Sequence, residues 1–175
     1  MFVMASEGEL FERLLLGYIG AFTRDLAKFP EDKWDWTPDL AAPTARMIAT
    51  HVWQWLVCDR QHLEEPDVTK HRLVPEPPTE PKAMISLIET ERENWERLLS
   101  RLIPGRLDDP VRQFGDTDGN VRGFVGHMLQ NTIYKCGQLS VLYFALGLDG
   151  KGPYEAPLPN AIYEEVWAVA NGSGS

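Results

Sequence analysis

Four polar residues lie on otherwise apolar helical faces, and their types could do chemistry: His51, His127, Asn131 and Lys135. His51 follows Ile48 at helical spacing, so its imidazole is predicted to point toward a core. The other three recur every fourth residue, which places them within about a quarter of a helix circumference. Helical bundles build their sites from inward side chains on facing helices. The sequence therefore predicts a polar pocket between two helices.

Each of these residues also has a structural interpretation. His51 could be a core histidine that donates to a backbone carbonyl, and His127 could simply pack. Lys135 could extend its ammonium to water while its aliphatic stem covers apolar surface. Asn131 could form a hydrogen bond to another helix. The sequence leaves the two interpretations open for every one of them.

Composition excludes several classes of function. The chain has 175 residues, with 17 Lys and Arg against 26 Asp and Glu, for a net charge of −9. This acidic balance argues against nucleic-acid partners, which require clustered basic residues, and against docking on anionic membranes. The length suits a single domain, predicted over residues 1–170, that buries a core without a disulfide or metal.

The compartment is predicted from the cysteines and the N-terminal residues. Cys58 and Cys136 form no CxxC pair, and so low a cysteine content is typical of a reducing environment. The opening MFVMASEGEL has no basic flank, so we expect no signal peptide. No apolar run approaches the roughly 18 to 20 residues of a membrane span. We therefore expect a cytoplasmic protein, with residues 171–175 as a flexible tail.

Apolar residues recur at helical period in four long segments. Ser6 and Glu9 have the spacing of a capping box, which marks the start of the first. Gly147 is a suitable residue to end the last. The pattern predicts helices over about residues 7–28, 44–63, 82–103 and 121–147.

The connections complete the predicted architecture. The prolines between Pro66 and Pro81 cannot lie in a helix interior, so this stretch is predicted to be a long extended crossover. Residues 116–120 form a turn signal, either the tip of a small hairpin or the lead into the fourth helix. A short final helix is predicted around Ile162, Val166 and Trp167. The fold class is therefore all-α, a four-helix bundle with a long crossover loop.

Two segments resemble the DinB-like (YfiT-type, damage-inducible) family of metal-binding four-helix bundles. The first is the Trp36–Pro38 loop followed by a helix that carries Ile48–His51, and the second is HMLQNTIYKCGQ over residues 127–138. That second helix commonly reads H-x-x-x-H-x-x-Y/H-H-R-G-Q in the family. Helix order, crossover and length agree, so the resemblance covers nearly the whole chain. Gln138 after Gly137 is predicted to be architectural, because glycine lets a second helix approach closely.

The resemblance implies a metal site that this sequence departs from. The family holds a divalent metal with one histidine from the second helix and two from the fourth. His51 matches the first ligand, but Asn131 and Lys135 occupy the other two positions. Asparagine is a poor ligand for zinc or nickel, and a protonated lysine repels a cation. We therefore expect a degenerate site and no metal cofactor, with Zn or Ni as the alternative.

Three functions remain open, and whether the protein is an enzyme is open with them. Lys135 would place one positive charge where the family has a metal. A pocket of His51, His127, Asn131 and Lys135 could then bind a carboxylate or another small anionic molecule. The first alternative is a metal-dependent thiol S-transferase or isomerase, as the resemblance to the wider superfamily implies. The second is a non-catalytic, homodimeric structural or stress-related protein, since bundles of this family often pair.

Overall fold

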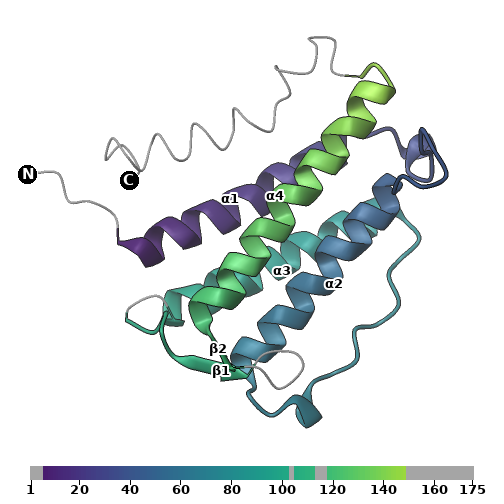
Figure 1. Cartoon of the computed structure of the whole chain (residues 1–175). Coiled ribbons are helices and arrows are strands. Elements are labelled where there is room, and N and C mark those ends of the chain that lie inside the picture. The colour runs from purple at the N-terminus through teal and green to yellow at the C-terminus, as the bar shows by residue number, and fades with distance from the viewer. Residues whose placement is uncertain (1–5, 103–104, 113–117, 149–175) are drawn as a thin grey trace, which may run out of the picture.

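Four helices dominate the computed structural model, which describes residues 6–102, 105–112 and 118–148 (Figure 1). Two single-turn 3₁₀ helices, Glu31–Lys33 and Val68–Lys70, lie in the connections. The long helices agree with the predicted segments to within two residues at each end. Their bounds are α1 Glu7–Lys28, α2 Ala45–Glu64, α3 Pro81–Leu102 and α4 Val121–Ala145.

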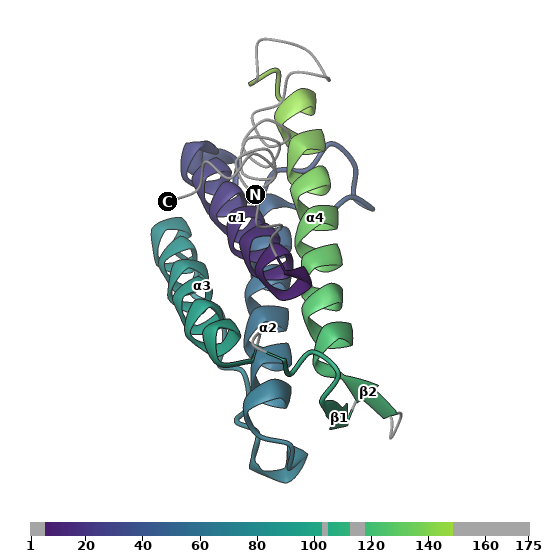
Figure 2. The ribbon, with the colours of Figure 1, turned by 90° about the vertical axis from the view of Figure 1, so that its left-hand side faces the viewer.

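Each helix packs against two others, in the cyclic order α1, α3, α2, α4 (Figure 2). The α2–α3 connection runs back along the bundle, so these two helices point in the same direction (Figure 1). A long crossover is what such a parallel pair requires, because a tight turn would make the helices antiparallel. The proline-rich stretch was predicted to be this crossover, and the structure confirms it. The topology brings α2 and α4 side by side, and these are the helices that carry the predicted polar residues.

Local sequence signals fix the helix ends. The hydroxyl of Ser6 accepts from the backbone N–H of Glu9, and the Glu9 carboxylate accepts from the backbone N–H of Ser6, which confirms the capping box. Asn120 caps α4 by accepting from the N–H of Gly123. At the other end of α4, Gly147 has φ +66° and closes the helix in the left-handed conformation that glycine tolerates.

A two-stranded hairpin precedes α4. Strand β1 (Pro110–Arg112) pairs antiparallel with β2 (Asp118–Asn120), with Val111 opposite Gly119. A hairpin is therefore present, but residues 118–120 of the turn signal form its second strand and lead into α4, while residues 116 and 117 lie outside the described residues. Because Asn120 ends β2 and also caps α4, the hairpin leads directly into that helix.

The core lies between the four helices and is rich in aromatic side chains. Trp95 of α3 is fully buried, and its indole N–H donates to the Leu56 carbonyl of α2 at 2.9 Å. Phe22 of α1 and Trp34 in the α1–α2 connection are buried with it. Truncating such a residue to alanine typically costs about 3 to 5 kcal/mol. The core thus holds α2, one wall of the predicted pocket, against α3.

One prediction is wrong, and two fall outside the described residues. Gly137 is exposed, and a Cβ there would meet nothing within 4 Å in the described part of the chain, so none of the four described helices approaches it. The sequence signal misled because Gly137 lies on the outer face of α4. The predicted final helix around Ile162 and the predicted tail over 171–175 lie outside the described residues. Among the residues that are described, no helix has the length and hydropathy to span a membrane.

Candidate functional site

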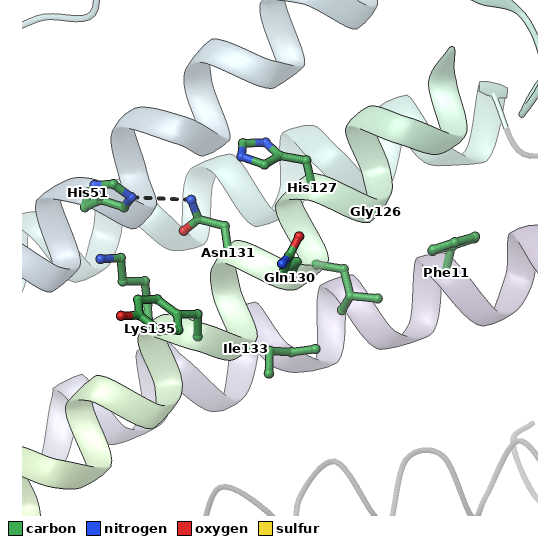
Figure 3. A pocket seen from close by; sticks show the side chains of 10 residues that line it. Phe11, His51, Gly126, His127, Gln130, Asn131, Ile133 and Lys135 are labelled. Atoms are coloured by element: carbon green, nitrogen blue, oxygen red, sulfur yellow. Dashed lines mark hydrogen bonds between the residues drawn. The ribbon is translucent and has the colours of Figure 1, made fainter. Parts of the chain in front are cut away.

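The four residues singled out from the sequence line one pocket of about 840 Å³ along α4. His51 reaches it from α2, while His127, Asn131 and Lys135 face it from successive turns of α4 (Figure 3). Both polar and apolar side chains form the remaining wall, which includes Phe11 of α1. Those further lining residues are Phe11, Gly126, Leu129, Gln130, Ile133 and Tyr134. The structure therefore brings the predicted residues together.

An amide–imidazole contact joins the two helices across the pocket. Asn131 Nδ2 lies 3.4 Å from His51 Nε2, in the orientation where the amide donates (Figure 3). This separation is long for a hydrogen bond, so the contact is weak. Asn131 Oδ1 is buried and has no hydrogen-bond partner in the described part of the chain. Asn131 thus reaches across to another helix, as one interpretation predicted, and keeps an unused acceptor.

His127 is held by a buried carboxylate. Its Nδ1 lies 2.6 Å from Asp59 Oδ2, and Asp59 on α2 is completely buried. Burial raises the pKa of Asp59 to about 6, and the bond to His127 opposes that rise. The Trp55 ring packs edge-on against the imidazole, with 5.2 Å between the ring centroids. The orientation of His127 is therefore fixed from two sides.

Lys135 supplies a positive charge that no carboxylate of the described chain pairs with. Its Nζ donates to Gln138 Oε1 at 2.9 Å and lies 5.4 Å from the centre of the Tyr134 ring. Burial lowers the pKa of Lys135 from its ordinary value of 10.5. Burial, followed by the charges of Lys135 and His127, also lowers the pKa of His51. At neutral pH the pocket therefore combines an ammonium with a neutral His51 imidazole.

The three residues that the resemblance places at metal-ligand positions offer one imidazole, one amide and one ammonium. His51 Nε2 faces the amide nitrogen of Asn131, and the third position carries the Lys135 ammonium. Zinc and nickel favour imidazole, thiolate or carboxylate donors. A neutral amide binds these metals weakly, and an ammonium repels them. In the described ranges no three His, Cys, Asp or Glu side chains are placed to hold a metal ion.

Sequence reasoning missed the part that Asp59 plays in the pocket. Asp59 lies on the buried face of α2, among apolar residues such as Val52 and Leu56. An acidic residue on an apolar stripe needs a partner, because a lone buried carboxylate is costly. That signal could have paired it with His127, which is the nearest predicted inward base on the facing helix. The wall residues Phe11 and Ile133 carry no comparable signal.

Comparison with solved structures identifies the class of fold. A similar arrangement occurs in the crystal structure of a DinB-like protein, YjoA, from Bacillus subtilis. The match has a TM-score of 0.65 and covers 79% of this chain and 92% of that chain, at 16% sequence identity. No protein-family model and no curated protein sequence matches the chain.

The chain therefore has a DinB-like fold, as the resemblance of its second and fourth helices implied. At 16% identity the likeness concerns the fold alone. What the pocket does must be argued from its own residues.

Proposed function

We propose that the protein binds a small anionic molecule in the α2–α4 pocket. The observation that carries this proposal is Lys135, a partly buried ammonium that faces the pocket and has no carboxylate partner in the described residues. A desolvated cation gains most from an anion that reaches it, because the attraction is stronger in a site of low dielectric constant. A carboxylate is the simplest such group.

The remaining pocket groups refine the ligand. A volume of about 840 Å³ lies within the range of small-molecule sites. The unused oxygen of Asn131 is an acceptor, so a ligand with a hydroxyl or amide N–H beside its anionic group would satisfy it. Phe11, Leu129 and Ile133 offer apolar surface for a carbon skeleton. The ligand class is therefore a small organic acid with one hydrogen-bond donor.

A thermal-stability screen tests this proposal. We expect a small dicarboxylate or hydroxy acid, with succinate, malate and citrate as first probes, to raise the melting temperature above that in NaCl of equal ionic strength. A ligand at 100 times its Kd adds about 2.7 kcal/mol to the free energy of unfolding, which is a shift of a few degrees for this size. Lys135→Gln should abolish the shift.

Lys82→Gln is the matched control. Lys82 is an exposed lysine on α3 whose partner is Glu31, far from the pocket residues in sequence. This variant should retain the full response to the acids. An equal response from wild type and Lys135→Gln would contradict the proposal, because the anion would then bind elsewhere.

Metal content separates this proposal from the thiol-transferase alternative. Thiol chemistry of the kind implied by the resemblance needs a bound metal, and the pocket offers one imidazole, one amide and one ammonium at the family positions. We propose that the protein, purified without a histidine tag and dialysed with Zn²⁺ or Ni²⁺, retains well under one equivalent. One retained equivalent that is lost in His51→Ala would favour the transferase.

A homodimer is a second proposal, favoured by the outer surface of α4. Apart from Arg122 and Lys135, this helix carries no Lys, Arg, Asp or Glu. Its exposed positions include Val141 and also Ile133 and Tyr134, which border the pocket, so the proposed dimer surface begins at the pocket's edge. Such a surface is typical of an interaction site. A second copy of the chain is the occupant we propose.

Sedimentation equilibrium of wild type, Tyr134→Lys and a form ending at residue 148 tests the dimer. We expect Tyr134→Lys to be monomeric and the shortened form to remain dimeric. A wild-type monomer that dimerises only when shortened would show that residues 149–175 cover this surface instead. We also propose a cytoplasmic location, which the free thiols of Cys58 and Cys136 support.

A further inference from the structure

We propose that His127 is a general base in this pocket and that Asp59 is its positioning residue. The proposed activity is the transfer of a proton from a bound molecule to His127 Nε2. This inference rests on the pocket being a ligand site, and it adds a reaction to the binding function. Its evidence is the geometry of the Asp59–His127 pair and the place of that pair at the pocket wall.

The buried carboxylate determines the tautomer of His127. At neutral pH the Asp59 carboxylate can only accept, so His127 Nδ1 must carry the proton that lies between them, with 2.6 Å separating the two heavy atoms. Whenever the ring is neutral, its lone pair is therefore on Nε2. Within the described chain no hydrogen bond uses Nε2, and the ring lines the pocket (Figure 3). A fixed imidazole with a free lone pair is the arrangement of a general base.

The buried carboxylate also stabilises the charge that forms during the reaction. Asp59 is 0% exposed, and its other oxygen, Oδ1, has no hydrogen-bond partner in the part of the chain that the structure describes. The carboxylate is therefore balanced by His127 alone among the described residues. When Nε2 accepts a proton, the resulting imidazolium and the carboxylate form a close ion pair. The buried charge of Asp59 thus stabilises the product of proton transfer.

A purely structural ion pair would look different. The His127 side chain is 43% exposed while its partner is fully buried, so the pair spans the boundary between core and pocket. By contrast, Arg60 on the other side of α2 pairs with Glu91 of α3, and both side chains are largely buried. The Arg60 guanidinium donates to both oxygens of the Glu91 carboxylate. The Asp59–His127 pair instead leaves one acceptor open at a cavity. That difference points to chemistry rather than to packing.

Positions along α4 constrain the substrate. His127 and Lys135 are eight residues apart, which is about 12 Å of helix axis. A molecule held by Lys135 at its anionic end would present a hydroxyl, a bound water or an acidic C–H at its other end. That X–H bond breaks, the electron pair stays on X, and the proton moves to Nε2. The substrate class is an extended small acid with a weakly acidic proton several bonds from its carboxylate.

Nitrogen NMR of the wild-type protein is the first test. The ¹⁵N shifts of uniformly labelled protein at pH 7.5 report which ring nitrogen of His127 carries hydrogen. We expect the Nδ1–H tautomer in the wild type and a mixture or the opposite tautomer in Asp59→Asn. An Nε2–H tautomer in the wild type would overturn the proposal, and this reading does not depend on any variant folding.

Hydrolysis of 4-nitrophenyl acetate is the second test. A water gives its proton to Nε2 as its oxygen adds to the ester carbonyl, and 4-nitrophenolate and acetate leave. General-base catalysis contributes typically 10² to 10⁴ in rate, so for an unselected ester we expect His127→Gln to lower the rate about tenfold or more. His71→Gln, which removes a half-buried histidine bonded to the Glu65 carbonyl, should leave the rate unchanged.

The outcomes separate this inference from the proposed function. The ester is neutral and needs no anionic anchor. If succinate, malate or citrate stabilises the protein through Lys135 but His127→Gln hydrolyses the ester at the wild-type rate, the general base is refuted and the binding function stands. If none of the acids stabilises the protein but His127→Gln loses activity, the base stands without the proposed ligand class.

Discussion

The two sides of helix α2 carry similar kinds of polar side chain in very different states. Toward α3, Arg60 donates to both oxygens of Glu91, at 2.7 and 3.1 Å, and to Glu64 at 2.6 Å. Toward α4, the Asp59–His127 bond and the weak His51–Asn131 contact leave Asp59 Oδ1 and Asn131 Oδ1 without a hydrogen-bond partner among the described residues. Within the described residues, the polar groups on the α3 side of α2 thus have hydrogen-bond partners, whereas two buried oxygens on its α4 side have none. We call these the satisfied side and the unsatisfied side.

This difference distinguishes structure from function. Buried polar groups normally find partners, since an unpaired one costs about 1 to 3 kcal/mol. The α3 side follows that rule. On the α4 side Asn131 and Lys135 line the cavity, Asp59 contacts the cavity residue His127, and among the described residues no carboxylate pairs with the Lys135 ammonium. Polar groups that the fold leaves unsatisfied are where a ligand can gain binding energy.

The largest predicted effect is on the satisfied side. Glu91→Ala leaves the Arg60 guanidinium in a largely buried place without its main partner. Loss of one member of a buried pair typically costs about 3 to 5 kcal/mol, and because this pair is partly exposed we expect about 2 to 3 kcal/mol. Urea unfolding measures the change. Glu93→Ala, an exposed neighbour on α3, should change the free energy of unfolding by less than about 0.5 kcal/mol.

The second prediction concerns pH and Asp59. Its pKa is raised from 3.8 to about 6 by burial, so between these values the folded protein keeps a proton that the unfolded chain has lost. Raising the pH from 4 to 6 therefore removes stability, on the order of 1 to 3 kcal/mol from this group, and the loss is complete above pH 6. Urea unfolding across this range measures the slope.

Asp59→Asn has no titrating group at this position and should lack that part of the slope. The NMR shifts of the His127 ring, which contacts Asp59, are recorded in both proteins to check that the imidazole keeps its place in the variant. An identical dependence on pH in wild type and variant would mean that Asp59 is not the buried acid that the structure places there.

A smaller effect is predicted for the unsatisfied side. Lys135→Met removes a partly buried charge and keeps the apolar stem, so we expect the free energy of unfolding to rise or stay within about 1 kcal/mol. The same variant should lose the response to small acids. A loss of several kcal/mol would show that Lys135 is structural, and the contrast between the two sides of α2 would fail.

The smallest effect is predicted for an exposed ion pair. Lys82 Nζ lies 3.0 Å from Glu31 Oε1, and both side chains are mostly in solvent. Surface pairs of this kind contribute less than about 1 kcal/mol, so Lys82→Gln should be nearly neutral in urea unfolding. A large loss in the free energy of unfolding of Lys82→Gln would mean that ion pairing stabilises this protein even without burial. The difference between the two sides of α2 could then not be explained by burial.

The sequence predicted what depends on local patterns. Helical periodicity gave the four helices, and the Ser6–Glu9 and Gly147 signals gave their ends, because caps are set by residues within one turn. The same periodicity grouped His127, Asn131 and Lys135 on one sector of α4, and the structure places all three at the pocket.

Contacts between distant segments were not predicted. Asp59 and His127 are 68 residues apart, and their bond depends on how α2 and α4 settle against each other. The prediction for Gly137 was wrong for the same reason, since only the packed bundle shows that none of the four described helices faces it. Periodicity gives the face of a helix, but the neighbour on that face comes from tertiary packing.

The central claim is that the unsatisfied α2–α4 face is an anion site, and NMR titration with succinate tests it most directly. The side-chain amide of Asn131 and the backbone amides around residues 131–135 should shift in a saturable way, and Lys135→Gln should remove those shifts. Shifts confined to exposed lysines such as Lys70 and Lys82, or shifts that persist unchanged in Lys135→Gln, would contradict the claim.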